Sequence, residues 1–396
     1  MRYEFVESDS SAKIKVFGVG GAGGNAINNM IAAGLKGVEF INANTDKQAL
    51  DISPCINKLQ LGINTTHGLG SGADPERGAM AAEESIEAIR AAAEDSDMVF
   101  ITAGMGGGTG TGASPMIARE SRNLGALTVG VVTKPFDFEG EKRMKTALLG
   151  IEELKKEVDT LLIIPNQRLK ALGDKGASFL ELMKKADDVL LYAVKGISDL
   201  IIIPGFINLD FADVRRVMGR MGTAIMGTGI ASGETRAIEA AQKAINSPLL
   251  EDISIDQAKG VLINITGSAK MSMDEISDAS SFVKDEVHSS AEIIWGMVFD
   301  ETMGDEIRIT VIATGIGDKK ERKVINLRGI DPENIDENWN SMTEEDLNKP
   351  TFQRRLANSE KYQQEQDLIP SKKGIFHRVF QKSDLDYPTF LRKQAD

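Results

Sequence analysis

The sequence predicts an α/β protein in which a helix-covered parallel sheet is joined by one long helix to a smaller α+β domain, with a disordered linker and tail behind it. Three observations predict this class. Apolar runs alternate with helical patterns between residues 14 and 164, as in parallel sheets covered on both faces. Apolar residues then recur every three or four positions from Phe179 to Ile201. Residues 318–383 are polar, charge-balanced and without periodicity.

The first domain follows a polar lead of residues 1–12. We expect its strands at residues 14–19, 38–43, 58–61, 97–103, 126–132 and 160–164, and its longer helices at 25–33, 75–93 and 139–156. A further helix is expected to open at Ser114-Pro115, because proline suits the first helical turn and serine caps it. Ligands of such sheets bind at the carboxyl ends of the strands, so the loops there carry the functional prediction.

The loop at residues 104–112, GMGGGTGTG, is the strongest functional signal. Without side chains, the backbone N–H groups of glycines crowd around an anion, and a following helix N-terminus adds partial positive charge. We interpret this loop as a phosphate cradle. The alternative is a flexible surface loop, which rarely falls between a buried strand and a helix.

A second glycine-rich turn, Gly18 to Asn25, contains GxGxxG at Gly18, Gly20 and Gly23, with Glu39 near the place of a ribose-binding acid. Alone it suggests an NAD(P)-dependent oxidoreductase. The second, richer cradle is unnecessary for a dinucleotide, and no GxxxxGK[ST] is present. Two glycine loops at one sheet edge therefore favour a longer phosphate chain.

Further loops are expected at the same edge. Asn44-Thr45-Asp46 follows the second strand, Gly70 to Pro75 precedes a helix, and Thr133 to Phe136 leads to Glu139 and Arg143. Glu139 and Arg143 are four apart, so a surface ion pair is as good an interpretation as ribose contact. Asn166 ends the strand at 160–164 and has the alternative role of a turn residue.

The composition of the chain excludes several classes of protein. Residues 1–317 hold 31 basic and 44 acidic residues, which accounts for the whole net charge of −13, so the folded body repels nucleic acid. A triphosphate would also be repelled unless a divalent cation offsets the field, so we expect Mg²⁺ at the phosphates. One cysteine, Cys55, excludes an internal disulfide, and no segment predicts export or a membrane span.

The long helix separates two groups of polar residues. It runs about 24 residues or roughly 35 Å, with Asp187 near its start and Asn208, Asp210 and Asp213 beyond its end. The carboxylates at 210 and 213 have a plain alternative role as helix caps and first-turn acids. If Asp187 touches a nucleotide, the later acids are about 30 Å away and reach only another chain's nucleotide. Head-to-tail stacking of this kind produces filaments and couples hydrolysis to assembly.

The remainder predicts a second domain and a tail. A glycine- and methionine-rich stretch at 219–233 precedes helices at 234–246 and 273–287 and strands at 260–266, 291–299 and 306–314. The histidines His67, His288 and His377 are scattered and form no ligand cluster. Lys372 to Lys382 is basic and amphipathic and fits a solvated segment that docks on a partner, with membrane contact as the alternative. The tail, 384–396, has the composition of a segment that folds on binding.

Five motifs together resemble the FtsZ family of bacterial cell-division proteins, the prokaryotic homologues of tubulin. They are GGAGGN at 20–25, GGGTGTG at 106–112, TKPFDFEGEKR at 133–143, NLDFADV at 208–214 and LDYPTFLRKQ at 385–394. The resemblance spans about residues 13–316 and resumes at the tail. It implies a Rossmann-like tubulin-type GTPase that polymerises head to tail into protofilaments of the cytokinetic ring, in the cytoplasm at midcell.

Sequence pattern and resemblance together predict the domain limits, and the resemblance implies the site residues. The limits are 13–177 for GTP binding, 178–202 for the central helix, 203–317 for the C-terminal domain, 318–383 for the linker and 384–396 for the tail. GTP or GDP, with Mg²⁺ on its phosphates, would be bound by Gly20, Gly21, Ala22, Gly23, Gly24, Asn25, Asn44, Gly72, Gly104, Gly106, Gly107, Gly108, Thr109, Gly110, Pro135, Glu139, Arg143, Asn166, Met183 and Asp187. Glu139 and Arg143 would lie on the ribose side, and Asn166 and Asp187 at guanine.

Catalysis and partner binding are implied at the far end of the chain. Asn208, Asp210 and Asp213 would act on the adjacent subunit's GTP by positioning or polarising water. Membrane-tethered division adaptors such as FtsA would bind the tail through Leu385, Asp386, Pro388, Phe390, Leu391 and Arg392.

Three positions depart from the family pattern. Met183 stands where an aromatic residue usually packs on the base, His67 replaces the usual arginine, and Leu191 with Lys195 alters the polar pattern late in the long helix. Methionine still packs against a purine, so we expect a changed affinity without loss of binding.

Overall fold

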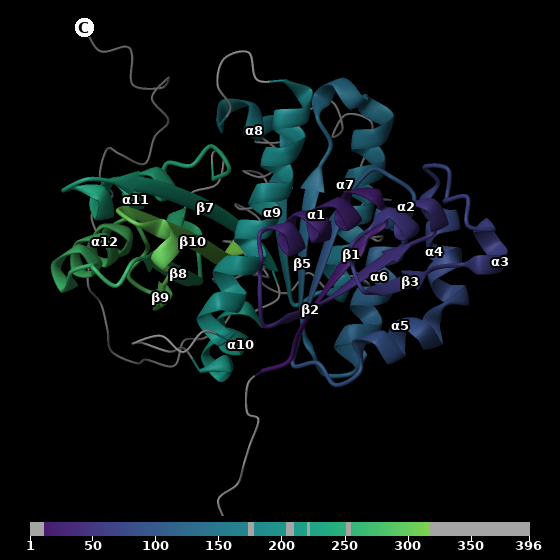
Figure 1. Ribbon diagram of the computed structural model, residues 1–396, viewed down its shortest axis with the longest axis horizontal. Helices are drawn as coiled ribbons and strands as arrows, with labels where there is room; N and C mark the ends of the chain where they lie inside the picture. The colour runs from purple at the N-terminus through teal and green to yellow at the C-terminus, as the bar shows by residue number, and fades with distance from the viewer. Residues whose placement is uncertain (1–11, 173–177, 203–209, 220–221, 251–254, 317–396) are drawn as a thin grey trace, which may run out of the picture. The chain divides into compact units, whose positions relative to one another are not determined.

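The computed structural model describes residues 12–172, 178–202, 210–219, 222–250 and 255–316. Within them, one ten-stranded sheet has the order β3-β2-β1-β4-β5-β6-β7-β10-β8-β9 (Figure 1). Its strands are β1 (Ile14–Val19), β2 (Val38–Asn44), β3 (Asn57–Gln60), β4 (Met98–Gly104), β5 (Leu127–Lys134), β6 (Thr160–Pro165), β7 (Gly222–Ser232), β8 (Gly260–Gly267), β9 (Glu292–Phe299) and β10 (Glu306–Ile316). The predicted α/β class is confirmed.

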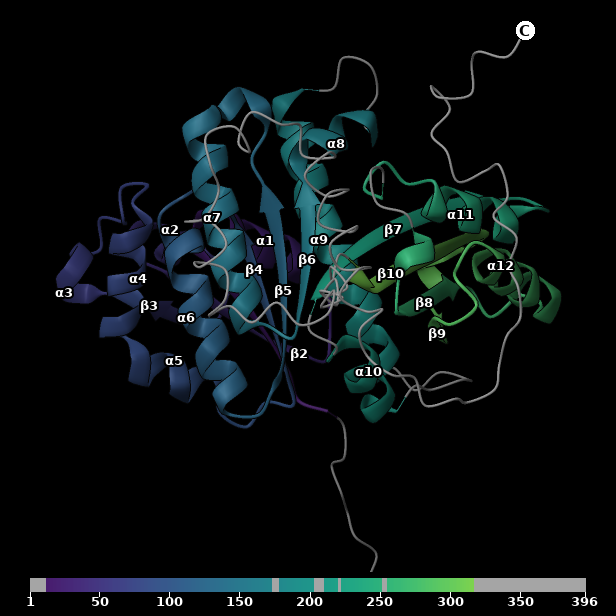
Figure 2. The same ribbon diagram turned by 180° about the vertical axis from the view of Figure 1, so that it is seen from behind.

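Strands β1 to β6 are all parallel, and helices cover both faces of this half of the sheet. The helices are α1 (Gly20–Ala32), α2 (Lys47–Ile52), α3 (Ile63–Thr66), α4 (Pro75–Glu84), α5 (Ile86–Ala93), α6 (Thr109–Asn123), α7 (Glu141–Glu157) and α8 (Asn166–Leu172). One face packs against α1 and the long helix α9 (Phe179–Ile202), and the other against α4 to α7 (Figure 2). Burial on both faces explains why β1, β4, β5 and β6 are mostly apolar runs, whereas the edge strand β3 is polar and partly exposed.

The second half of the sheet packs against α9 on one face and against α11 (Arg236–Ile245) and α12 (Met273–Asp285) on the other. Here β10 runs antiparallel to both β7 and β8, while β8 and β9 are parallel. The short helix α10 (Phe211–Met218) packs through Val214 and Val217 into the core cluster of α9. The predicted 24-residue helix is confirmed as α9, which lies between the two halves.

Three expected helix limits are wrong. Helix α1 begins at Gly20 rather than residue 25, and the helix expected over 75–93 is broken at Ser85, between α4 and α5. Helix α6 begins at Thr109, so Pro115 lies inside it, and the Ser114 hydroxyl donates to the Gly110 carbonyl at 2.6 Å instead of capping.

Close packing explains the early start of α6. A Cβ at Gly108 would lie 2.2 Å from the Ser71 hydroxyl, and one at Gly112 would lie 2.0 Å from the Pro75 carbonyl oxygen. Helix α4 therefore presses directly on the backbone of α6. This tertiary contact outweighs the weak helix propensity of glycine and the usual preference of proline for a helix start.

The two halves of the sheet are also continuous, which the sequence did not indicate. Thr160, Leu161 and Leu162 of β6 pair in parallel with residues 222–224 of β7. Strand β7 lies in the glycine- and methionine-rich stretch. A Cβ at Gly227 or Gly229 would lie 2.0 Å from a carbonyl oxygen of α11. These glycines let α11 pack directly on the strand, and they hide its β pattern in the sequence.

Candidate functional site

The loops that follow β1 and β4 meet at the carboxyl edge of the sheet. A Cβ at Gly20, where φ is +72°, would lie 2.9 Å from the Gly110 nitrogen, and one at Gly104 would lie 2.6 Å from the Ala22 methyl group. The N-termini of α1 and α6 are therefore in direct contact. Two helix N-termini built from glycine-rich turns present unpaired backbone N–H groups and partial positive charge to one place.

The glycines at this edge have two different roles. Gly23 and Gly110 have no room for a side chain, because a Cβ would lie 2.3 Å from the Thr102 carbonyl oxygen and 2.8 Å from that of Gly104. By contrast, a Cβ at Gly21, Gly72 or Gly107 would meet no described atom within 4 Å. The first group permits close packing of the two turns. The second group leaves open space at the backbone, as a bound phosphate requires.

Buried hydroxyl groups join three of the loops. The Thr109 hydroxyl lies 2.6 Å from that of Thr45, in the loop after β2, and 3.0 Å from that of Ser71. The Thr111 hydroxyl accepts from the Gly106 N–H at 2.9 Å and fixes the turn before α6. Of these, only Thr109 was expected as a site residue, since threonine and serine carry no distinctive spacing in the sequence.

The loop after β2 is held by Asn44. Its side-chain oxygen accepts from the Asp46 N–H at 3.1 Å, and its carbonyl accepts from Leu61 at 2.9 Å. Asn44 is buried. In this structure it shapes the loop, and its predicted contact with the nucleotide remains a prediction.

The loop after β5 carries the predicted ribose side. Glu139 accepts from the Phe136 N–H at 2.7 Å and pairs with Arg143 at 3.1 Å, so the ion-pair alternative is present here. The Met105 N–H donates to the Thr133 carbonyl at 2.9 Å and ties this loop to the glycine loop after β4. Pro135 and Phe136 of this loop are buried. Ribose contact remains a prediction.

The predicted base side lies at α8 and the first half of α9. Asn166 is the first residue of α8, and its buried Oδ1 has no hydrogen-bond partner among the described residues. Burial and the neighbouring Asp188 raise the pKa of Asp187 to about 6. An acceptor oxygen without a donor, and a carboxylate short of solvent, both suit the N–H donors of a purine base. Met183 is half-buried on the same helix.

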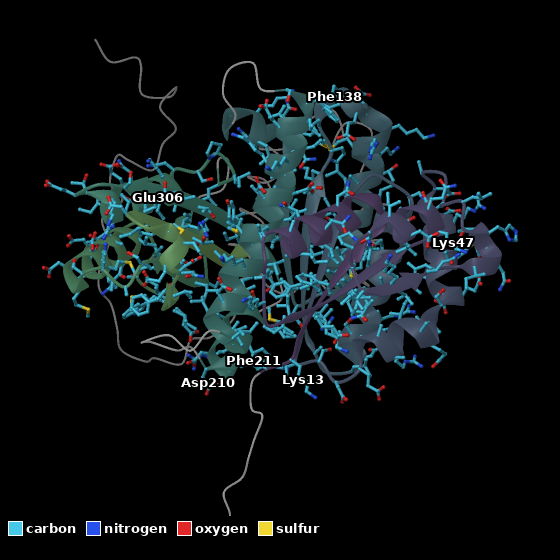
Figure 3. All side chains as sticks on the ribbon, in the orientation of Figure 1. Lys13, Lys47, Phe138, Asp210, Phe211 and Glu306 are labelled. Carbon is cyan, nitrogen blue, oxygen red and sulfur yellow. The ribbon has the colours of Figure 1, made fainter. Side chains whose placement is uncertain are left out.

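Asp210 and Asp213 lie at the opposite edge of the sheet. Figure 3 shows Asp210 and Phe211 beside Lys13, which precedes β1, whereas Phe138 of the loop after β5 lies at the other end. Asp210 caps α10 by accepting from the Ala212 N–H at 3.2 Å, so its predicted alternative role as a cap is present. Asn208 lies outside the described residues.

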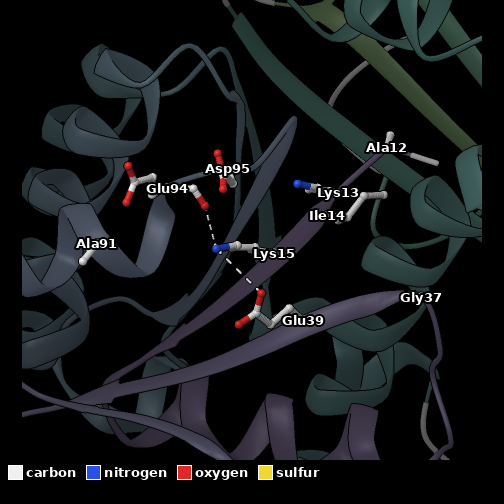
Figure 4. A pocket seen from close by; sticks show the side chains of 9 residues that line it. All are labelled: Ala12, Lys13, Ile14, Lys15, Gly37, Glu39, Ala91, Glu94 and Asp95. Atoms are coloured by element: carbon white, nitrogen blue, oxygen red, sulfur yellow. Dashed lines mark hydrogen bonds and ion pairs between the residues drawn. The ribbon is translucent and has the colours of Figure 1, made fainter. Parts of the chain in front are cut away.

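The pocket shown in Figure 4 lies at this amino edge and differs from the glycine-lined site. It is a hollow of about 560 Å³ at the starts of β1 and β2. Lys15 on its floor donates to the carbonyls of Ala92 and Glu94 at 2.9 and 2.7 Å and lies 3.7 Å from Glu39. The Lys15 ammonium is thus satisfied within the protein, and Glu39 is engaged there rather than at a ribose.

The family departures have defined surroundings. His67 ends α3 in the left-handed region with φ of 52°, and Leu191 is buried. The Lys195 ammonium lies 3.4 Å from Asp300 and 4.0 Å from Asp199, so it links α9 to the residue after β9. In the part of the chain that the structure describes, no group of three histidine, cysteine or acidic residues is placed to hold a metal, and no helix is long and apolar enough to cross a membrane.

The fold and its glycine-lined edge define a tubulin-like GTPase. Residues 13–174 match the GTPase domain of the Tubulin/FtsZ family, and residues 222–317 match the C-terminal domain of the FtsZ family. The chain belongs to the FtsZ family. The match to a GTPase domain counts against the oxidoreductase alternative.

Relatives support this membership over most of the chain. The cell division protein FtsZ of Rickettsia prowazekii is 54% identical over 341 residues, covering 86% of this chain and 74% of that protein. FtsZ of Rickettsia felis is 49% identical over 399 residues, covering 96% and 87%. The solved structure of an empty FtsZ dimer from M. jannaschii has a TM-score of 0.75 and 44% identity, covering 78% of this chain and 89% of that chain.

Proposed function

We propose that this chain binds and hydrolyses GTP and assembles head to tail into protofilaments for cell division, each active site being completed by the next subunit. One observation carries the proposal: the glycine-lined loops follow the carboxyl ends of β1 and β4, whereas α10, which Asp210 caps, is bonded to Asp97 and Gly125 before the starts of β4 and β5. Helix α9, about 35 Å long by its residue count, separates them. One chain therefore supplies binding groups at one end and carboxylates at the other.

The binding half suits a guanine nucleotide. The N–H groups at the starts of α1 and α6 would hold the phosphates, with the open backbone at Gly21, Gly72 and Gly107 admitting their oxygens. Asn166 and Asp187 would accept from the guanine N–H groups, and Glu139 and Arg143 would face the ribose. The other predicted glycines shape the turns.

The hydrolytic half would come from the adjacent subunit. Asp210 and Asp213 sit at the start of α10, and with Asn208 they would orient and polarise the water that attacks the γ-phosphate. A carboxylate placed there takes up part of the water's developing positive charge. Hydrolysis would then require assembly.

Mg²⁺ fits the donor set only as a partner of the nucleotide. The described loops offer N–H groups and hydroxyls rather than a cluster of carboxylates, so the phosphate oxygens themselves would supply most of its ligands. When bound, the ion neutralises phosphate charge that the acidic body would otherwise repel.

Family membership supports our proposals on assembly and location. The FtsZ from M. jannaschii forms a dimer, and we propose a head-to-tail contact of the same chain here. The filaments would work in the cytoplasm at the midcell division site. The tail residues at 385–392, which lie outside the described residues, would bind a membrane-tethered adaptor such as FtsA, and we propose the domain limits given above.

Light scattering and phosphate release, followed together after GTP and Mg²⁺ are added to the full chain, test the proposal. We expect both to rise together, and the Asp210→Ala variant to bind GTP and lose turnover. The matched control is Lys156→Gln, which removes the cation of an exposed pair on α7 and should behave as the parent chain. Normal turnover in Asp210→Ala, or turnover without assembly, would contradict the shared site.

A further inference from the structure

Two consecutive arginines attach helix α10 to both halves of the sheet. Arg215 donates to the carbonyl oxygens of Asp97 and Gly125, just before β4 and β5, at 3.3 Å. Arg216 points to the other half: its Nε lies 2.6 Å from the Glu292 carboxylate at the first residue of β9. Successive helix residues point about 100° apart, so the pair fixes the helix from two directions.

Arg216 also contacts an acid of the proposed hydrolytic half. Its Nη2 lies 3.1 Å from Asp213 Oδ1, one helical turn earlier. The planar guanidinium therefore bridges two carboxylates, one on α10 and one on β9. Arginine provides donors in a fixed fork for such a bridge, whereas lysine has a single ammonium.

Apolar packing fixes the short helix but does not by itself set the direction of the Asp213 carboxylate. The helix is eight residues long, and its buried side chains are Val214, Val217 and Met218. In its first turn, Phe211 packs against the core cluster of α9, whereas the Asp213 side chain is only half-buried. The bridge of Arg216 between Asp213 and Glu292 thus restrains the Asp213 carboxylate itself.

We infer that Arg216 is a positioning residue for GTP hydrolysis: it holds the Asp213 carboxylate in the direction required by the neighbouring subunit's GTP. The inference rests on the proposed function. In this proposal Arg216 acts through Asp213. Misplacement of a catalytic group by about 1 Å costs up to 100-fold in rate, so a loosened helix shows in turnover.

The expected changes separate positioning from binding. In Arg216→Gln, Asp213 loses this cation and α10 loses its link to Glu292, so phosphate release per assembled subunit should fall about tenfold. The GTP affinity of the unassembled chain should stay within about twofold, because the binding loops lie at the other edge. Arg216→Lys should recover part of the loss, and Glu292→Gln should lower turnover in the same direction by a smaller factor.

The full chain with GTP and Mg²⁺ serves for the test. Phosphate release per assembled subunit, GTP affinity and unfolding midpoint are measured for these variants, for Asp213→Asn, for the double variant Asp213→Asn/Arg216→Gln, and for the control Lys156→Gln. If Arg216 acts through Asp213, the double variant should turn over no more slowly than Asp213→Asn alone. A merely structural arginine would add its own loss.

Each result has a defined meaning. Turnover of Arg216→Gln equal to the control overturns the inference. The inference is also overturned if GTP affinity falls by the same factor as turnover and the unfolding midpoint falls with them. The same holds if the double variant turns over more slowly than Asp213→Asn. If Asp213→Asn hydrolyses normally, the proposed shared site itself is wrong. A loss in Asp213→Asn without one in Arg216→Gln removes only the role of Arg216.

Discussion

The hydroxyl oxygens of Thr45 and Thr109 lie 2.6 Å apart in a buried contact between the loop after β2 and the first residue of α6. Ser71 adds a second hydroxyl 3.0 Å from Thr109. Three loops far apart in the sequence thereby share one small polar cluster beneath the glycine-lined edge. Their relative position, and so the shape of the proposed phosphate site, depends on it.

Thr109→Val should reduce both stability and nucleotide binding. Valine keeps the shape of threonine but leaves the buried Thr45 and Ser71 hydroxyls without this partner, which costs about 1–3 kcal/mol in the free energy of unfolding. GTP affinity should fall because the start of α6 is released. Urea unfolding and a nucleotide-binding titration measure the two effects. Thr109→Ser keeps the hydroxyl and is the control; equal stability of the valine and serine variants would contradict the prediction.

Alanine should lower the stability of the chain at Gly112 and the affinity for GTP at Gly107. At Gly112 the added methyl group would lie 2.0 Å from the Pro75 carbonyl oxygen and separate α6 from α4, so unfolding should become easier by about 1–3 kcal/mol or more. At Gly107 the methyl group meets no described atom within 4 Å, so stability should hold while GTP affinity falls about tenfold, or 1.4 kcal/mol. Thermal unfolding and GTP titration distinguish them. A stable Gly112→Ala chain would show that the helices can separate freely.

The sequence predicted the parts of the fold that depend on local pattern. Helix α9 has strong apolar periodicity, and strands β1, β4, β5 and β6 are mostly apolar runs. The rule that ligands bind at strand carboxyl ends placed the glycine loops together. The start of α6 was missed because its packing on α4 is a contact between distant segments, which overrides the local preference at Ser114-Pro115. The continuous sheet was missed because Gly227 and Gly229 obscure the pattern of β7.

The candidate site divides in the same way. Glycine-rich turns are legible in a sequence because their composition is unusual. Other contacts involve common residue types, and their role arises only across the fold. They are the hydroxyls of Thr45 and Ser71 and the partners of α10 at Asp97, Gly125 and Glu292. The sequence allows both a structural and a functional role for Glu139, Asp210 and Asp213. The structure shows their ion pairs and the helix cap, and these contacts are compatible with the functional role.

The raised pKa of Asp187 should make guanine binding pH-dependent. Burial and Asp188 raise it to about 6, and only the ionised carboxylate accepts from both guanine N–H groups. The affinity for GDP should therefore weaken as the pH falls below about 6, by up to tenfold per unit. Asp187→Asn should lack this added pH dependence and should prefer a xanthine nucleotide, whose oxygen replaces the guanine amino group. Parallel pH profiles for the two chains would place the base elsewhere.

Replacing Asp199 should reveal a cost of ionisation within α9. Burial raises the pKa of its carboxyl group to about 6; Lys195 and Arg308 lower it, and Asp300 raises it. Between about pH 4 and pH 6 the folded chain then binds this proton more tightly than the unfolded chain does, so stability falls as the pH rises through that window. Above it, the ionised group costs roughly 2–3 kcal/mol.

Asp199→Asn should therefore be more stable than the parent at pH 8, by up to that amount, and equally stable near pH 4. Asp300 is the opposite case: although burial raises the pKa of its carboxyl group, hydrogen bonds from Thr302 and the Lys195 ammonium lower it overall, so Asp300→Asn should lose stability at pH 8. Urea unfolding at pH 4, 6 and 8 measures both differences. Loss of stability at pH 8 in both variants would mean that Lys195 needs both carboxylates, and that pairing outweighs desolvation in this cluster.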